Sequence, residues 1–290
     1  MQLAFNYSRE AAALLEAGAI ALDRWKCPPW PNLITEARQT LPVYVHFDLY
    51  AGGGQMDTVS WDVIERLLDS TGTPFVNLHL TPTLDDFGFA AEPLTDIQRA
   101  QVIETMIGDV QFVARRFGPE RVIVENIPYR GQREANGWHF LRPAVEPAVF
   151  AQVLEATGAG MLFDIAHATI TADTLGLDAQ SYIAAHPLGK LHELHVAGVQ
   201  PHSGALEDHL AMSKLDWHLL EFALGKVAEG HASVPWIVAC EYGGLGPNFA
   251  WRSEADVIAD HAPRLRRMLD AVSLPEKPDA IYPASAQSRS

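Results

Sequence analysis

Eight short apolar segments recur along the chain, and stretches in which apolar residues have helical spacing separate most of them. The apolar segments are predicted strands, at residues 3–6, 20–25, 42–48, 75–80, 121–126, 160–165, 191–197 and 236–241. Predicted helices lie at residues 9–17, 61–70, 97–117, 147–157, 179–185, 216–228 and 253–272. A parallel sheet covered by helices requires this alternation. Eight such strands predict an α/β fold, a single (β/α)₈ or TIM barrel.

The length of the chain fits one barrel and a short extension. The chain has 290 residues, enough to form one large core, and no linker-like segment divides it. Residues 1–272 are therefore expected to form one catalytic barrel domain. Residues 273–290 are rich in Pro, Ser and Ala, and we expect them to be a disordered tail.

Charge and cysteine content exclude several classes of function. The net charge is −15, from 36 acidic and 21 basic residues, and no run of Lys or Arg occurs, which argues against a nucleic-acid partner. The sequence contains no segment of eighteen apolar residues and no recognisable export signal, so we expect a cytoplasmic protein without a membrane partner. Cys27 and Cys240 lie far apart, which fits neither a disulfide framework nor a thiolate zinc site.

Residues able to bind metals fall at the carboxyl ends of the predicted strands. Side chains from different strands of a (β/α)₈ barrel converge at that end. The residues that end a strand or closely follow one are His46, His79, Glu125, Asp164, His167, His195 and Glu241. The loop after the seventh predicted strand adds Glu207, Asp208 and His209. We therefore expect these side chains to meet at one mouth of the barrel.

A cluster of this composition is best explained by bound metal ions. A single histidine at a strand end is usually a structural residue, and a single acidic residue there usually caps the next helix. Burying many carboxylates together without cations would cost several kcal/mol each. The mixture of imidazole and carboxylate suits zinc, iron or manganese better than calcium or magnesium alone. The sequence thus predicts two or three metal ions.

Two more residues are candidate catalytic groups. Asn126 directly follows Glu125 and is expected to support it. His202 lies in the loop before the segment Leu-Glu-Asp-His and is expected to line the pocket.

The ordered series of candidate ligands resembles the metal-ligand series of the endonuclease IV and xylose isomerase-like barrel superfamily. Within it, the chain looks most like the multinuclear non-haem iron-dependent oxidative enzymes (MNIO). The segment VENIPY is similar to the Leu-Glu-Asn motif of that family, and LHVAG is similar to its His-x-Ala-Gly stretch. The chain departs from the family at His167, where asparagines are usual and endonucleases have histidine. It also has Glu207 where Asp is usual, which leaves Asp208 as the competing ligand.

The resemblance implies an oxidative enzyme with a di- or tri-iron site. Its implied substrate is a cysteine-containing peptide or another thiol, often delivered by a partner protein. Zinc and manganese stay open as alternative metals. A zinc phosphoesterase of endonuclease IV type is favoured by His167 but not by the acidic composition. A sugar isomerase or epimerase with one Mn²⁺ or Mg²⁺ leaves most of the histidines unused, and a metal store is the non-enzymatic alternative.

Overall fold

The barrel is built from one curled parallel sheet. A computed structural model describes residues 1–132, 137–202, 204–246 and 252–273. Nine strands pair in the order β3-β2-β1-β11-β8-β7-β6-β5-β4. Their bounds are β1 (Gln2–Asn6), β2 (Arg24–Cys27), β3 (Val43–Val45), β4 (Tyr50–Ala51), β5 (Val76–Leu80), β6 (Val122–Glu125), β7 (Gly160–Asp164), β8 (Leu191–Val196) and β11 (Ile237–Cys240).

One stretch of chain joins the two edges of this sheet. Strands β3 and β4 are separated only by residues 46–49, yet β3 pairs with β2 and β4 pairs with β5. The backbone N–H of His46 donates to Cys27 O at 2.9 Å, and that of His79 donates to Leu49 O at 2.8 Å. β3 lies within the third predicted strand, residues 42–48, and β4 follows two residues after its predicted end. Because this one stretch pairs with both edges, the sheet closes as the expected (β/α)₈ barrel, and the fold prediction is confirmed.

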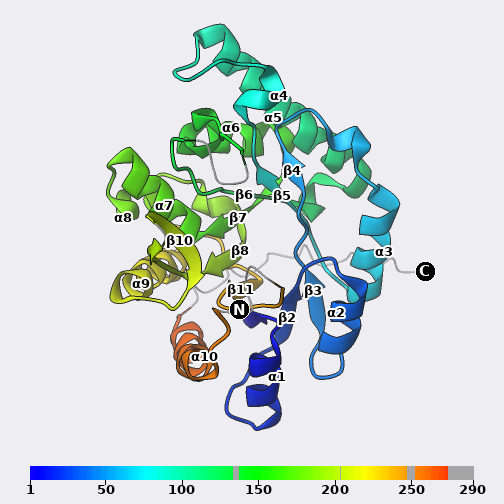
Figure 1. Ribbon diagram of the computed structural model, residues 1–290, viewed down its shortest axis with the longest axis vertical. Coiled ribbons are helices and arrows are strands. Elements are labelled where there is room, and N and C mark those ends of the chain that lie inside the picture. The colour runs from blue at the N-terminus through cyan, green and yellow to red at the C-terminus, as the bar shows by residue number, and fades with distance from the viewer. Residues whose placement is uncertain (133–136, 203, 247–251, 274–290) are drawn as a thin grey trace, which may run out of the picture.

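Helices surround the sheet (Figure 1). They are α1 (Arg9–Glu16), α2 (Pro31–Ala37), α3 (Trp61–Thr71), α4 (Leu84–Phe87), α5 (Asp96–Phe117), α6 (Pro147–Thr157), α7 (Ile165–Leu175), α8 (Ala179–Ala184), α9 (Lys214–Ala228) and α10 (Ala255–Asp270). Short 3₁₀ turns lie at η1 (Met56–Thr58), η2 (Pro119–Arg121), η3 (Arg142–Val145) and η4 (Leu188–Lys190). None of the helices in the described ranges is long and apolar enough to cross a bilayer.

Several elements differ from the sequence prediction. The helices α2, α4 and α7 were not expected, nor was the antiparallel hairpin of β9 (Gly198–His202) and β10 (Ala205–Leu210). The second strand was predicted at residues 20–25, but β2 runs to Cys27, where Pro28 and Pro29 end it because proline lacks a backbone N–H. Of the predicted tail at 273–290, all but Ser273 lies outside the described residues.

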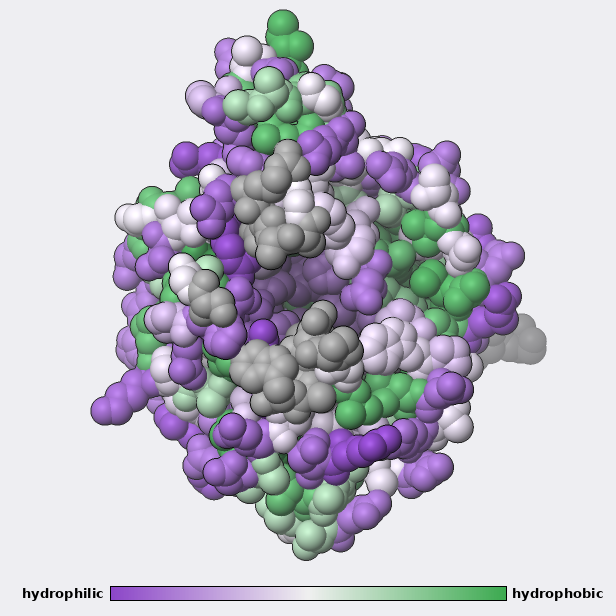
Figure 2. Space-filling model, in the orientation of Figure 1, coloured by the Kyte–Doolittle hydropathy of each residue, from purple (hydrophilic) through white to green (hydrophobic). Residues whose placement is uncertain are grey.

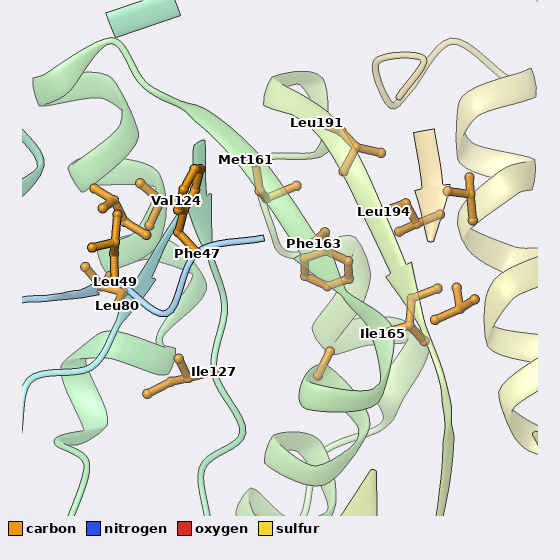
Figure 3. Close-up of a cluster of buried hydrophobic side chains, with 14 of the residues drawn as sticks. Phe47, Leu49, Leu80, Val124, Ile127, Met161, Phe163, Ile165, Leu191 and Leu194 are labelled. Atoms are coloured by element: carbon orange, nitrogen blue, oxygen red, sulfur yellow. The ribbon is translucent and has the colours of Figure 1, made fainter. Parts of the chain in front are cut away.

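Alternate residues along each strand point to opposite sides of the barrel wall. Val124, Phe163 and Leu194 come directly before Glu125, Asp164 and His195, and all three apolar side chains are buried in the main hydrophobic cluster. Figure 3 shows them among the buried apolar side chains of the core, together with Leu80 and Met161. The apolar side chains anchor the strand ends, so the polar residue that follows each of them is directed into the barrel.

A buried carboxylate fixes the loop after β4. Asp109 of α5 accepts hydrogen bonds through Oδ2 from the backbone N–H groups of Gly52 at 2.7 Å and Gly54 at 2.9 Å. Both glycines have left-handed backbone, with φ of 109° and 75°. A Cβ at Gly52 would also lie only 3.0 Å from the ring of Pro82. The loop is therefore a fixed turn rather than a flexible one.

We expect Asp109→Ala to lower the free energy of unfolding by about 1–3 kcal/mol, because the buried N–H of Gly52 loses its acceptor. Urea unfolding followed by circular dichroism measures this change. Glu155→Ala, at an exposed position of α6, is the control and should be nearly neutral. Equal stability of the two variants would show that Asp109 does not hold the loop.

Candidate metal centre

The predicted ligands meet at the carboxyl end of the barrel strands. Three groups of residues could each hold a metal ion, because the donor atoms within each group all lie within 4.8 Å of one another. The groups are His46–Glu125–His195, Glu125–Asp164–His167 and Asp164–His195–Glu241. Because Glu125, Asp164 and His195 each belong to two of these groups, the donors form one continuous cluster. Its members come from strands far apart in sequence, as the strand-end pattern predicts.

Glu125 lies at the middle of the cluster. Its Oε2 is 3.1 Å from His79 Nε2 and 3.5 Å from His46 Nε2. Its Oε1 is 3.6 Å from His167 Nδ1 and 3.7 Å from His195 Nδ1. Burial by itself would raise the pKa of this carboxyl. The neighbouring His79 and His46 lower the pKa by more than burial raises it, so the net pKa lies below its usual range. Glu125 is thus an ionised carboxylate that can bridge two cations.

Asp164 has two roles at the junction of β7 and α7. Its Oδ1 accepts a hydrogen bond from His167 N at 2.7 Å and caps α7. Its Oδ2 is buried without a hydrogen-bond partner among the described residues and lies 4.0 Å from His195 Nδ1. Burial raises the pKa of Asp164 above its usual value. One carboxylate oxygen of Asp164 therefore caps the helix, and the other is left as a candidate metal ligand.

His195 is surrounded by carboxylates. Its Nδ1 is 3.0 Å from Glu241 Oε1, and the side chain is completely buried. Burial lowers the pKa of this imidazole, but Glu241 raises it more, and the net pKa lies well above the usual value. The carboxylates around His195 therefore favour positive charge at this position.

The hairpin β9–β10 supplies the last members of the cluster. Asp208 Oδ2 lies 3.2 Å from His167 Nε2. His209 has left-handed backbone with φ 58°, next to an irregularity in the strand pairing, and its Nδ1 donates to Glu241 O at 2.8 Å. Such a conformation is uncommon for residues other than glycine, and here it directs His209 Nε2 to within 3.6 Å of Glu241 Oε2.

The structure separates the two acidic candidates of this hairpin. Glu207 is one residue before Asp208, on the other side of the strand, and its Oε2 lies 3.7 Å from Arg130 Nη2. The structure therefore brings Asp208 into the cluster, and Glu207 is not part of it. Residue spacing alone did not distinguish them, because the register of the hairpin decides which side chain faces the barrel.

Of the two expected catalytic residues, Asn126 lies at the cluster with other partners than expected, and His202 lies away from the cavity. Asn126 does not support the Glu125 side chain: its Nδ2 donates to Asp164 O at 2.9 Å, and its Oδ1 accepts from Asp164 N at 2.8 Å. The Asn126 carbonyl also accepts from His167 Nδ1 at 2.8 Å, so the residue orients two other candidate ligands. His202 is exposed at the end of β9 and does not line the cavity above the cluster.

Lys26 is a site residue that the sequence analysis missed. Its buried ammonium forms an ion pair with Glu241 Oε1, and both side chains are almost inaccessible to solvent. Burial lowers the pKa of Lys26, but Glu241 raises it more, so the lysine stays charged. The end-of-strand rule would have selected Lys26 if the second strand had been placed at its observed position.

A cavity of about 220 Å³ opens above the cluster. Figure 2 shows a hollow with a hydrophilic interior in the middle of the molecular face that it presents. His46, Glu125 and Glu241 line the polar side, whereas Tyr7, Trp30, Leu33 and Leu245 form an apolar wall. The cavity has room for a substrate side chain next to the candidate ligands.

The donor set fits divalent metal ions. Buried donors without a hydrogen-bond partner among the described residues include His79 Nδ1, Glu125 Oε2, Asp164 Oδ2 and His195 Nδ1. Glu125, Asp164, Asp208 and Glu241 bring four carboxylates together, and Lys26 is the only lysine or arginine among the described residues that line the cavity. Nitrogen and oxygen donors in this ratio suit iron, zinc or manganese. We assign the four carboxylates as candidate ligands, together with five histidines, which are His46, His79, His167, His195 and His209.

Comparison with known proteins gives one family match. The model of the family described as RiPP precursor modification enzyme MbnB/TglH/ChrH matches residues 25–236. A UPF0276 protein of Chromobacterium violaceum is 22% identical over 178 residues, which are 60% of this chain and 61% of that protein. The chain thus matches about three fifths of the length of this relative.

Solved structures of enzymes with other activities are similar in fold. A 3-keto-D-glucoside 4-epimerase from E. coli aligns with a TM-score of 0.54 and 16% identity over 92% of this chain and 99% of its own. A family 2 AP endonuclease from Brucella melitensis aligns with a TM-score of 0.52 and 17% identity over 90% of this chain and 98% of its own. At these identities the likeness concerns the fold alone.

Lys26→Met should change two properties in opposite directions. The metal-free variant should be less stable by about 3–5 kcal/mol, because Glu241 becomes a buried carboxylate without its ammonium partner. Its affinity for Zn²⁺ should rise, because a positive charge next to the donors is removed. Urea unfolding and competition with a chromogenic chelator measure the two effects. Lys190→Met, at an exposed position, is the matched control. Weaker zinc binding by Lys26→Met would show that Lys26 does not act as a positive charge that competes with the metal ion.

Proposed function

The chain belongs to the RiPP precursor modification enzyme family MbnB/TglH/ChrH, and we propose that it is an oxidative enzyme with two or three iron ions that modifies a cysteine-containing peptide. The family membership confirms the resemblance that the sequence indicated. The family is described as one of enzymes that modify peptide precursors, and this description supports the proposed peptide substrate. A partner protein that delivers the peptide is part of the proposal.

The observation that carries the proposal is the sharing of donors. Glu125, Asp164 and His195 each belong to two groups of potential ligands, and Glu125 has imidazole nitrogens within 3.7 Å of both its oxygens. A mononuclear site needs no such sharing. Iron bound here would supply exchangeable positions at which dioxygen and a thiol meet.

Other residues of the chain fix the positions of the candidate ligands and shape the cavity. Lys26 holds Glu241 in a fixed position, and Asn126 holds Asp164 and His167. Trp30 and Leu33 give the cavity an apolar surface next to the candidate ligands. A peptide side chain that enters along this wall would reach the ligand cluster with little freedom to rotate.

A zinc phosphoesterase is the second candidate function. His167 favours it, since this position departs from the asparagines that are usual in the iron enzymes. The net charge of −15 opposes a nucleic-acid substrate, because phosphate contacts supply most non-specific affinity. A sugar epimerase with one Mn²⁺ or Mg²⁺ would leave the second and third donor groups without a role.

Protein purified without oxygen should contain about two or three iron ions per chain and show Mössbauer signals of coupled iron. Asp164→Asn should bind less iron, because it loses a charged donor and keeps the oxygen that caps α7. Glu155→Gln is the control and should load normally. A protein that carries only zinc and does not consume oxygen in the presence of thiol peptides would contradict the proposal.

The iron-loaded enzyme should change the mass of a cysteine-containing peptide only when dioxygen is present. The same peptide with Ser in place of Cys should stay unmodified, because the thiol is the proposed reacting group. Mass spectrometry of both peptides after incubation checks this. Equal modification of the two peptides would exclude a thiol-directed reaction.

A further inference from the structure

A buried carboxylate and a buried phenol lie one layer below the candidate ligands. Glu193 is two residues before His195 on β8, and Tyr44 is two residues before His46 on the closing stretch of chain. Residues two apart on a strand face the same side, so both side chains point into the barrel. The exposed fraction is 3% for Glu193 and 1% for Tyr44.

These two residues form a connected set with His195. Tyr44 OH donates to Glu193 Oε1 at 2.9 Å. His195 Nε2 lies 2.7 Å from the same oxygen. The chain of contacts therefore crosses the barrel interior from β3 to β8 and ends on a candidate ligand.

The chemistry of this contact fixes where the hydrogen of His195 lies. A carboxylate that already receives a hydrogen bond from Tyr44 can only accept from His195, so Nε2 carries a hydrogen atom. The Nδ1 atom of a neutral His195 ring then presents a lone pair to the cluster. That lone pair faces Glu241 Oε1 at 3.0 Å and Asp164 Oδ2 at 4.0 Å, an arrangement that is repulsive unless a cation lies between them.

The other histidines with fixed rings face the cluster through the opposite nitrogen. His167 and His209 use Nδ1 to donate to the backbone carbonyls of Asn126 and Glu241, which leaves Nε2 for the cluster. His46 and His79 direct Nε2 toward Glu125. His195 therefore differs from them, and Glu193 is the group that turns it.

We infer that Glu193 and Tyr44 are positioning residues, which hold His195 with its Nδ1 atom as the metal-binding nitrogen. The inference rests on the proposed metal centre and adds to it two residues that contact no ion themselves. Stability alone is a weak reason for this buried set, because replacing all members of such a set by well-packed apolar residues is often neutral or stabilising. Outer partners of this kind tune the affinity of a ligating histidine for its metal.

The test compares Glu193→Leu with Glu193→Gln, and Glu155→Gln is the surface control. Zn²⁺ affinity is measured by chelator competition, and the stability of the metal-free proteins by urea unfolding. Glu193→Leu should bind zinc about 10–100-fold more weakly, and its metal-free form should also be less stable, because Tyr44 and His195 lose their buried acceptor. Glu193→Gln should lose less, because its amide oxygen still accepts from His195 Nε2.

Nitrogen-15 NMR of the zinc-loaded proteins provides a signature that a purely structural role would not change. The wild type should show one histidine ring bound through Nδ1, and this signal should be lost in Glu193→Leu. Unchanged affinity and an unchanged Nδ1 signal in Glu193→Leu would overturn the inference while the wild type still loads normally. A wild type that binds no metal would instead overturn the proposed function, and the inference with it.

Discussion

The concentration of buried carboxylates at one mouth of the barrel is the constraint on which the rest of this structure depends. Glu125, Asp164, Asp208 and Glu241 lie within reach of one another, and each would repel its neighbours without positive charge between them. In the metal-free protein, the ammonium group of Lys26 supplies part of that charge. Metal ions would supply the rest, which is why the site fits a multinuclear centre.

The fold makes this concentration of charge tolerable by anchoring most of the candidate ligands at rigid strand ends. The apolar residues that precede the ligands pack into the outer core, so a shift of one ligand would disturb buried contacts such as those of Phe163 and Leu194. The hairpin β9–β10 is different, because it brings Asp208 and His209 from outside the sheet. The centre therefore combines ligands fixed by the barrel with two that depend on the register of a hairpin.

Strand-end ligands could be predicted from the sequence because they follow apolar runs whose period is local. His46, His79, Glu125 and His195 were found in this way. Lys26 was missed because the second strand lies further along the chain than its apolar residues indicate, and only the prolines after Cys27 mark its end. The choice between Glu207 and Asp208 depends on hairpin register, and the role of Glu193 depends on a partner, Tyr44, that lies 149 positions away in sequence. Neither has a local signal.

The central claim is that residues from six strands and a hairpin share two or more metal ions. Anomalous-scattering maps from crystals of anaerobically purified protein, collected at the iron and zinc absorption edges, test it most directly. We predict at least two iron peaks, with Glu125 between them and His195 Nδ1 bound to one. A single peak, or peaks away from Glu125, Asp164 and Glu241, would contradict the account.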